Sequence, residues 1–137
     1  MAELEDVRRA NLAIARAKAY KKALDRQIWE FGTLDGEPIA KLTVANGTST
    51  IIDLEDYAKV SQFVWTCSKK YIVRIENGKK IYLHKYLMNT PDNMQCDHKY
   101  NDTFDNRKSR LRNCTPMQNN ANASKRSGTS SRFKGVT

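Results

Sequence analysis

The chain has 137 residues, a net charge of +9 and 39% hydrophobic residues, which allows one domain with a modest core or a small domain with appendages. Its three cysteines are odd in number and form no Cys-x-x-Cys pair, which argues against a disulfide framework or a zinc knuckle and favours a reducing compartment. No stretch approaches the ~20 apolar residues of a membrane helix, and the N-terminus lacks the apolar segment of a signal peptide, so we expect a soluble protein of the cytoplasm.

The excess positive charge is concentrated towards the C-terminus. Residues 94–137 carry nine basic and three acidic side chains, which accounts for +6 of the net charge. A polyanionic partner is the natural inference, because each phosphate that a basic side chain neutralises releases counterions. The alternative is a solvated basic face.

Residues 1–31 contain no Gly or Pro and are rich in Ala, Leu, Arg, Lys and Glu, which predicts one long helix to about Phe31. Its apolar residues form a thin stripe that Lys21 interrupts. The stripe consists of Val7, Ala10, Ile14, Ala17, Leu24 and Ile28. It can pack on the domain itself, on a second copy of the chain or on another protein.

Residues 37–93 predict a small antiparallel β unit with short helices. Asn46-Gly47 and Asn77-Gly78 are two-residue hairpin signals, each between runs that favour strands. Residues 84–88 have helical character, and Pro91 stops that helix. The aromatic residues that we expect in the core are Trp65, Tyr71 and Tyr82.

Residues 94–126 predict a strand, a loop, a returning strand and a short helix. The expected strands are 94–99 and 110–114, with turn-forming residues between them. Thr115-Pro116 predicts a helix over 117–123, because threonine caps a helix and proline suits its first position. Residues 127–137 then form a basic tail, so the predicted fold class is α+β.

The candidate chemistry lies in this last unit. An imidazole at His98 can take a proton from water near neutral pH. Carboxylate and carboxamide oxygens, such as those of Asp97 and Asn119, suit a hard divalent cation. In a strand Asp97 and His98 point to opposite faces, so they share a site only if the strand ends or twists there.

The sequence resembles the HNH endonucleases of phages and mobile introns over about residues 38–126. The segments that carry the resemblance are Ile81–Met88, Cys96–His98, Asp105–Arg112, Cys114-Thr115 and Gln118–Asn120, with upstream matches at Lys41–Thr43, Ile51–Asp53, Tyr57, Val60-Ser61 and Trp65.

The resemblance implies a ββα-metal motif at residues 94–126 that hydrolyses double-stranded DNA in a bacterial or phage-infected cell. His98 would be the general base, Asp97 and Asn119 would hold one Mg²⁺ or Mn²⁺, and Asn106 would support the loop between the strands. The expected contacts to DNA are Arg107, Lys108, Arg112, Lys125, Arg126, Arg132 and Lys134.

One position departs from the family pattern. Arg110 stands where the family has the asparagine that orients the base, and arginine cannot accept a hydrogen bond. Asn113, Asn106 or a carbonyl group can substitute for it. If none does, the chain is a slow nuclease or a DNA-binding protein with an impaired site. A third hypothesis is a nucleoprotein partner that docks through residues 2–31.

Two further features carry weaker signals. Residues 130–136 resemble the opening of an AP2-type DNA-binding domain, and a basic tail is the alternative. His84 precedes a lysine in a motif that recurs in the HNH family. We expect it to be a structural histidine rather than a metal ligand.

Overall fold

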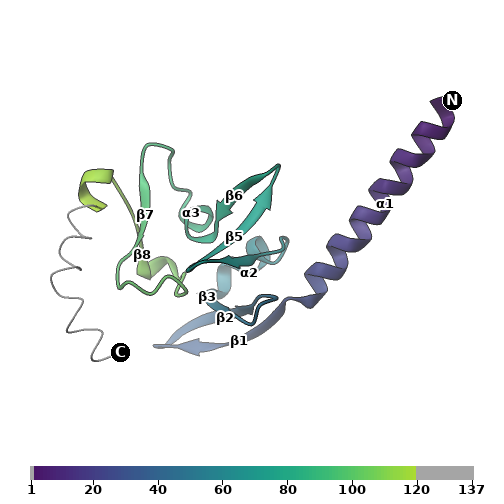
Figure 1. The fold of residues 1–137 in the computed structure, drawn as a ribbon. Helices are drawn as coiled ribbons and strands as arrows, with labels where there is room; N and C mark the ends of the chain where they lie inside the picture. The colour runs from purple at the N-terminus through teal and green to yellow at the C-terminus, as the bar shows by residue number, and fades with distance from the viewer. Residues whose placement is uncertain (1, 120–137) are drawn as a thin grey trace.

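The computed structural model describes residues 2–119, with side chains from residue 4 onward, and its fold is α+β (Figure 1). A long helix precedes small antiparallel sheets and short helices. The elements are α1 (Ala2–Arg26), β1 (Ile28–Leu34), β2 (Glu37–Thr43), β3 (Ser49–Asp53), η1 (Leu54–Asp56), α2 (Tyr57–Val60), β4 (Thr66–Ser68), β5 (Tyr71–Glu76), β6 (Lys79–Tyr82), α3 (Leu83–Met88), β7 (Gln95–His98), η2 (Lys108–Arg110) and β8 (Leu111–Cys114).

The predicted long helix ends earlier than the composition suggests. Helix α1 stops at Arg26, and the residues expected to finish the helix form β1 instead. The side chain of Gln27 is buried and fixes this break, because its Nε2 donates to the Phe63 carbonyl (2.9 Å) and its Oε1 accepts from the Trp65 amide (2.7 Å). The Ile-Trp-Glu-Phe run that follows has β-branched and aromatic residues, which favour a strand.

Strands β1, β2 and β3 form one antiparallel sheet, and β4, β5 and β6 form a second. The predicted turn at Asn77-Gly78 joins β5 to β6, and both residues have positive φ (50° and 77°), as a tight primed turn requires. Asn46-Gly47 lies in a longer loop between β2 and β3. The two-residue turn is therefore confirmed at Asn77-Gly78, whereas at Asn46-Gly47 the hairpin is confirmed but the two-residue turn is wrong.

The core lies among these two sheets and the helices α2 and α3. Trp65 is 1% exposed, and its indole N–H donates to the Val60 carbonyl (2.9 Å). The other buried members of the core are Ala40, Leu42, Val44, Ile52, Val60, Ile72, Leu83 and Leu87. The core position predicted for Trp65 is confirmed, whereas Tyr71 and Tyr82 are only half-buried.

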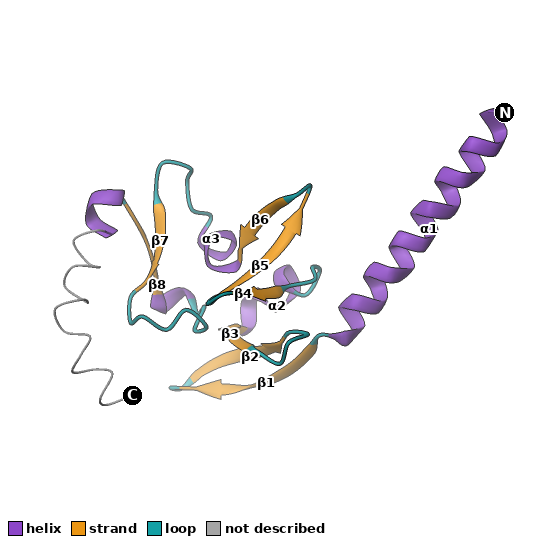
Figure 2. Ribbon diagram, in the orientation of Figure 1, coloured by secondary structure: helices purple, strands orange, loops and turns teal. Residues whose placement is uncertain are grey.

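Strands β7 and β8 form a separate antiparallel hairpin that lies against α3 (Figure 2). The long loop between them is tied to β3, since the Ile51 amide donates to the Phe104 carbonyl (3.0 Å) and the Asn106 amide to the Ile51 carbonyl (2.8 Å). Residues 116–119 are helical. Thr115 and Gln118 cap this turn reciprocally, with side chain to backbone distances of 3.2 and 2.9 Å.

Helix α1 extends away from the rest of the molecule (Figure 1). Every side chain from residue 4 to residue 22 is exposed. Tyr20 ties the helix to the body, because its hydroxyl accepts from the Val64 amide (3.1 Å) and donates to the Gln62 carbonyl (3.4 Å). Among residues 2–119, no helix has both the length and the apolar character that crossing a membrane requires.

Candidate functional site

A hollow of about 250 Å³ lies where the end of β7 meets the β4–β5 turn and the helical turn at residues 116–119. Its lining is mostly polar. The residues that form it are Lys70, Tyr71, Cys96, Asp97, His98, Asn101, Thr103 and Asn119. The expected general base His98 and the expected metal ligands Asp97 and Asn119 therefore line one hollow, whereas Asn106 and Arg110, also expected at the catalytic site, are not among its lining residues.

The end of β7 explains how two consecutive residues reach one hollow. The strand ends at His98, and the chain turns there, since the Asn101 amide donates to the His98 carbonyl (3.1 Å). Asn101 has a positive φ of 65°, a conformation that asparagine tolerates better than most residues. Asp97 and His98 are the last two residues of β7, and both line the hollow at this end of the strand.

His98 is held by a buried carboxamide. Its Nε2 lies 2.9 Å from Oδ1 of Asn106, which is 1% exposed. The amide nitrogen of Asn106 donates to Thr50 Oγ1 (2.8 Å), and Thr50 in turn donates to the Phe104 carbonyl (2.8 Å). This chain of donors fixes the carboxamide with its oxygen towards the imidazole. Nε2 therefore carries the proton, and Nδ1 is the basic nitrogen.

The surroundings of His98 favour its neutral form. Burial lowers the pKa of His98, and this effect outweighs the opposing effects of the hydrogen bond that the imidazole donates to Asn106 and of the nearby carboxylates of Asp97, Asp102 and Asp105. A neutral imidazole is the form that accepts a proton.

Arg110 does not take the place of the family asparagine. Its guanidinium is directed to Asp35 (3.4 Å) and Asp105 (3.9 Å) and lies 5.6 Å from the ring of Tyr100. Asn113 does not substitute either, because it accepts from the Thr90 hydroxyl (2.7 Å) and donates to the Met88 carbonyl (3.0 Å). Asn106, one of the substitutes considered from the sequence, bonds His98.

Asp97 and Asn119 are the oxygen donors of the hollow. Asp97 lies on β7 directly across from Arg112 on β8, with 3.9 Å between its Oδ2 and Nη2 of the arginine. Asn119 donates its amide nitrogen to Gln95 Oε1, which leaves the carboxamide oxygen as the atom suited to a cation. One carboxylate and one amide oxygen fit Mg²⁺, which keeps several waters and takes its other ligands from a phosphate.

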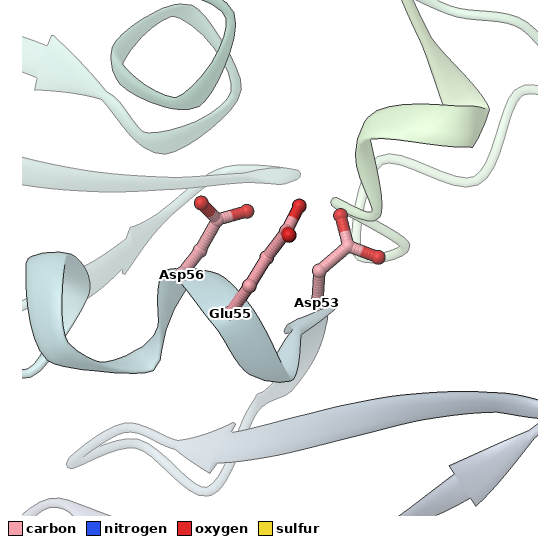
Figure 3. Close-up of side chains that lie close together, drawn as sticks. All are labelled: Asp53, Glu55 and Asp56. Atoms are coloured by element: carbon pink, nitrogen blue, oxygen red, sulfur yellow. The ribbon is translucent and has the colours of Figure 1, made fainter.

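A second acidic group, formed by Asp53, Glu55 and Asp56, lies between β3 and α2 (Figure 3). Two of its carboxylates already bind the ammonium group of Lys108. Lys108 Nζ lies 2.7 Å from Glu55 and 3.2 Å from Asp56, and the Lys108 amide donates to Asp53 (2.9 Å). The bond from Glu55 is the largest of the effects that raise the pKa of Lys108. This cluster therefore secures the loop that carries Lys108.

Arg107, like Lys108, is bound by carboxylates of the protein. It is 3% exposed, and its guanidinium bonds Asp105 (2.7 Å), Asp35 (3.2 Å) and Glu37 (3.1 Å). The bonds to Asp105 in particular raise its pKa. These contacts anchor the β7–β8 loop to the β1–β2 turn. Arg107 and Lys108, expected from the sequence to contact phosphate, are thus both engaged by carboxylates of the protein.

His84 forms part of the wall behind His98. The two ring centroids are 4.7 Å apart, and His84 also stacks on Tyr71 at 5.4 Å. Burial, followed by the charges of His98 and Lys85, lowers the pKa of His84 to about 3. His84 is therefore neutral at physiological pH and adds no charge beside His98.

Sequence reasoning missed the contribution of the β4–β5 turn. Lys70 lines the hollow from this turn, and Thr103 holds it there by donating to the Lys70 carbonyl. The basic pair Lys69-Lys70 before a strand was the available signal, but nothing local places it beside residues nearly thirty positions away. Four predicted DNA contacts, and the AP2-like segment, lie outside the described residues. These contacts are Lys125, Arg126, Arg132 and Lys134.

Comparison of the chain with protein-family models, with curated proteins and with solved structures finds no match. The residues of the hollow and their geometry therefore provide the basis for inferring a function.

Proposed function

We propose that this chain is an HNH-type endonuclease that hydrolyses phosphodiester bonds of double-stranded DNA with one divalent metal ion. The observation that supports it best is the meeting of Asp97, His98 and Asn119 in one polar hollow, with Asn106 bonded to His98. Phosphodiester hydrolysis needs a general base, oxygen ligands for a metal ion and positive charge near the phosphate, and the hollow offers residues for each of these.

In the proposed reaction, Nδ1 of His98 takes a proton from a water molecule. The water oxygen then bonds the phosphorus, and the bond to the 3′ oxygen breaks on the opposite side. Asn106 holds the imidazole in the tautomer that makes Nδ1 basic, and it stabilises the imidazolium that forms. A Mg²⁺ or Mn²⁺ ion held by Asp97 and Asn119 would supply Lewis-acid stabilisation of the charge on the phosphate and on the departing oxygen.

Basic side chains around the hollow support a nucleic-acid substrate. Lys70 lines it, and Lys69 and Lys99 are exposed on the adjoining loops. Arg112 lies beside Asp97, and its side chain is 43% exposed. A guanidinium group suits the oxygens of a DNA phosphate. In this proposal Lys70 and Arg112 replace Arg107 and Lys108 as the principal phosphate contacts.

A plasmid-nicking assay with Mg²⁺ tests the proposal. We expect the unmodified chain to convert supercoiled plasmid to the nicked form, and His98→Ala to lose this activity. Lys79→Ala, an exposed change on β6, is the matched control and should nick normally. Equal nicking by His98→Ala would show that another group or a contaminant is responsible. Binding without any nicking by the unmodified chain would favour the alternative of a DNA-binding protein with an impaired site.

A further inference from the structure

Helix α1 presents a seam of apolar and small residues, interrupted by Lys21, that is exposed except at the half-buried Leu24. The positions of the seam alternate at spacings of three and four residues, the pattern of a two-helix interface. They are Val7, Ala10, Ile14, Ala17, Lys21 and Leu24. Val7 is 55% exposed and Ile14 53%. Most of the stability of a helix in a protein comes from the packing of its apolar face, so a partner along this seam would add stability to α1.

The charges of α1 are complementary to a second copy in the opposite direction. The first turns carry Glu3, Glu5 and Asp6, with no base before Arg8. The last eleven residues carry one acid, Asp25, and five bases. These bases are Arg16, Lys18, Lys21, Lys22 and Arg26. Two antiparallel copies place the acidic end of each beside the basic end of the other, whereas two parallel copies place like charges together.

We propose that α1 pairs antiparallel with α1 of a second copy of this chain. The seam then packs Ile14 against Ala17 of the partner helix at the centre and Val7 against its Leu24 at the ends. Lys21 packs against Ala10 of the partner helix and reaches its Asp6, one turn away. In a parallel pair Lys21 of one copy would instead face Lys21 of the other, and the like charges would repel.

The expected contact is small and reversible. Helix α1 is about 37 Å long at 1.5 Å per residue, and a pair of such helices buries roughly 1,200 Å² in total, the lower limit for a specific interface. We therefore expect association at concentrations on the order of micromolar. This inference does not depend on the nuclease proposal, because no residue of α1 lines the hollow at His98.

Sedimentation velocity of the full chain over a range of concentrations tests the pairing. We expect a monomer–dimer equilibrium, and Ile14→Asp should raise the dissociation constant at least about tenfold, since it buries a charge in the seam. Leu12→Asp is the matched control. Leu12 is 51% exposed and lies about 160° around the helix from Ile14, so this change should leave association unaltered.

A charge exchange tests the direction of the pair. Asp6→Lys and Lys21→Glu should each weaken association, and the chain with both changes should recover it, because the two contacts are restored with reversed signs. A parallel pair would not recover, since the glutamates introduced at position 21 of the two copies would face each other. A monomer at all concentrations, equal effects of Ile14→Asp and Leu12→Asp, or no recovery in the double variant would overturn the proposal.

Discussion

At the scale of single residues, a buried carboxamide, that of Asn106, holds the imidazole of His98. Asn106 bonds the imidazole, and Thr50 and Thr103 on either side hold its amide nitrogen. The sequence identified His98 and offered Asn106 among several substitutes. The choice required Thr50, which lies 56 positions before Asn106, and no local pattern predicts that contact.

The first prediction concerns Asn106. Asn106→Ala should lower the nicking rate by roughly 10- to 100-fold, because the imidazole loses the group that sets its tautomer. Nicking rates at saturating DNA measure this effect. Asn113→Ala removes a carboxamide from the same hairpin and serves as the control. A comparable loss of rate in both variants would mean that the hairpin, and not the orientation of His98, determines the effect.

The second prediction concerns Arg110. Its guanidinium is directed to Asp35 and Asp105, so Arg110→Asn should leave the nicking rate within about threefold of the parent. The single-turnover rate constants for nicking by Arg110→Asn and by the parent measure this effect. A large increase would show that arginine at this position impairs the site and that Asn106 does not complete it.

The third prediction concerns the oxygen donors. Asp97→Ala and Asn119→Ala should each abolish turnover at ordinary Mg²⁺ concentration, while DNA affinity stays within about threefold because phosphate contacts fix the complex. Gel-shift titrations in EDTA measure the affinity separately from cleavage. Asp92→Ala, an exposed change of the same type, should alter neither property.

At the scale of elements, the β7–β8 loop is built as a set of anchored ion pairs. Arg107 joins it to the β1–β2 turn through Asp35 and Glu37, and Lys108 joins it to η1 through Glu55 and Asp56. The sequence correctly predicted a strand, a loop and a returning strand here, and the helix expected over 117–123 is confirmed to residue 119, the last described residue. It did not predict the anchors, because their acidic partners lie more than fifty positions earlier.

The fourth prediction follows from these anchors. Arg107→Gln should lower the free energy of unfolding by about 2 kcal/mol, since it removes the buried cation that bonds Asp105, whose side chain is 15% exposed, while water can solvate the more exposed Asp35 and Glu37. Arg110→Gln, whose side chain is 28% exposed, should cost less than about 1 kcal/mol. Urea denaturation of both variants measures the difference. Equal losses would contradict the anchoring role of Arg107.

The ion pair between Arg107 and Asp105 makes the stability of the fold depend on pH. Burial raises the pKa of Asp105, but the hydrogen bonds from Arg107 outweigh burial and lower it. A carboxyl group whose pKa is lowered by folding stabilises the fold above its unfolded pKa, and this stability is lost as the pH falls through the folded pKa. The difference in the free energy of unfolding between the parent and Arg107→Gln should therefore become smaller on acidification below about pH 4. A constant difference across that range would exclude this contribution.

At the scale of the whole molecule, α1 and the hollow at His98 are separate structures. Composition predicted the helix, but its end was placed too late, because Gln27 is fixed by Phe63 and Trp65 of a distant loop. No side chain of α1 lines the hollow.

Removal of residues 2–19, which spares Tyr20 and Gln27, should therefore leave the nicking rate per chain unchanged and abolish association. A large loss of nicking by the truncated monomer would show that the helix contributes to the site.

The measurement that tests the central claim most directly is the anomalous density of Mn²⁺ in crystals of this chain. We expect one peak in the hollow, within coordination distance of the Asp97 carboxylate and the Asn119 carboxamide oxygen, and its loss in Asp97→Ala. An empty hollow, or a peak confined to Asp53, Glu55 and Asp56, would contradict the assignment of the metal and with it the proposed mechanism.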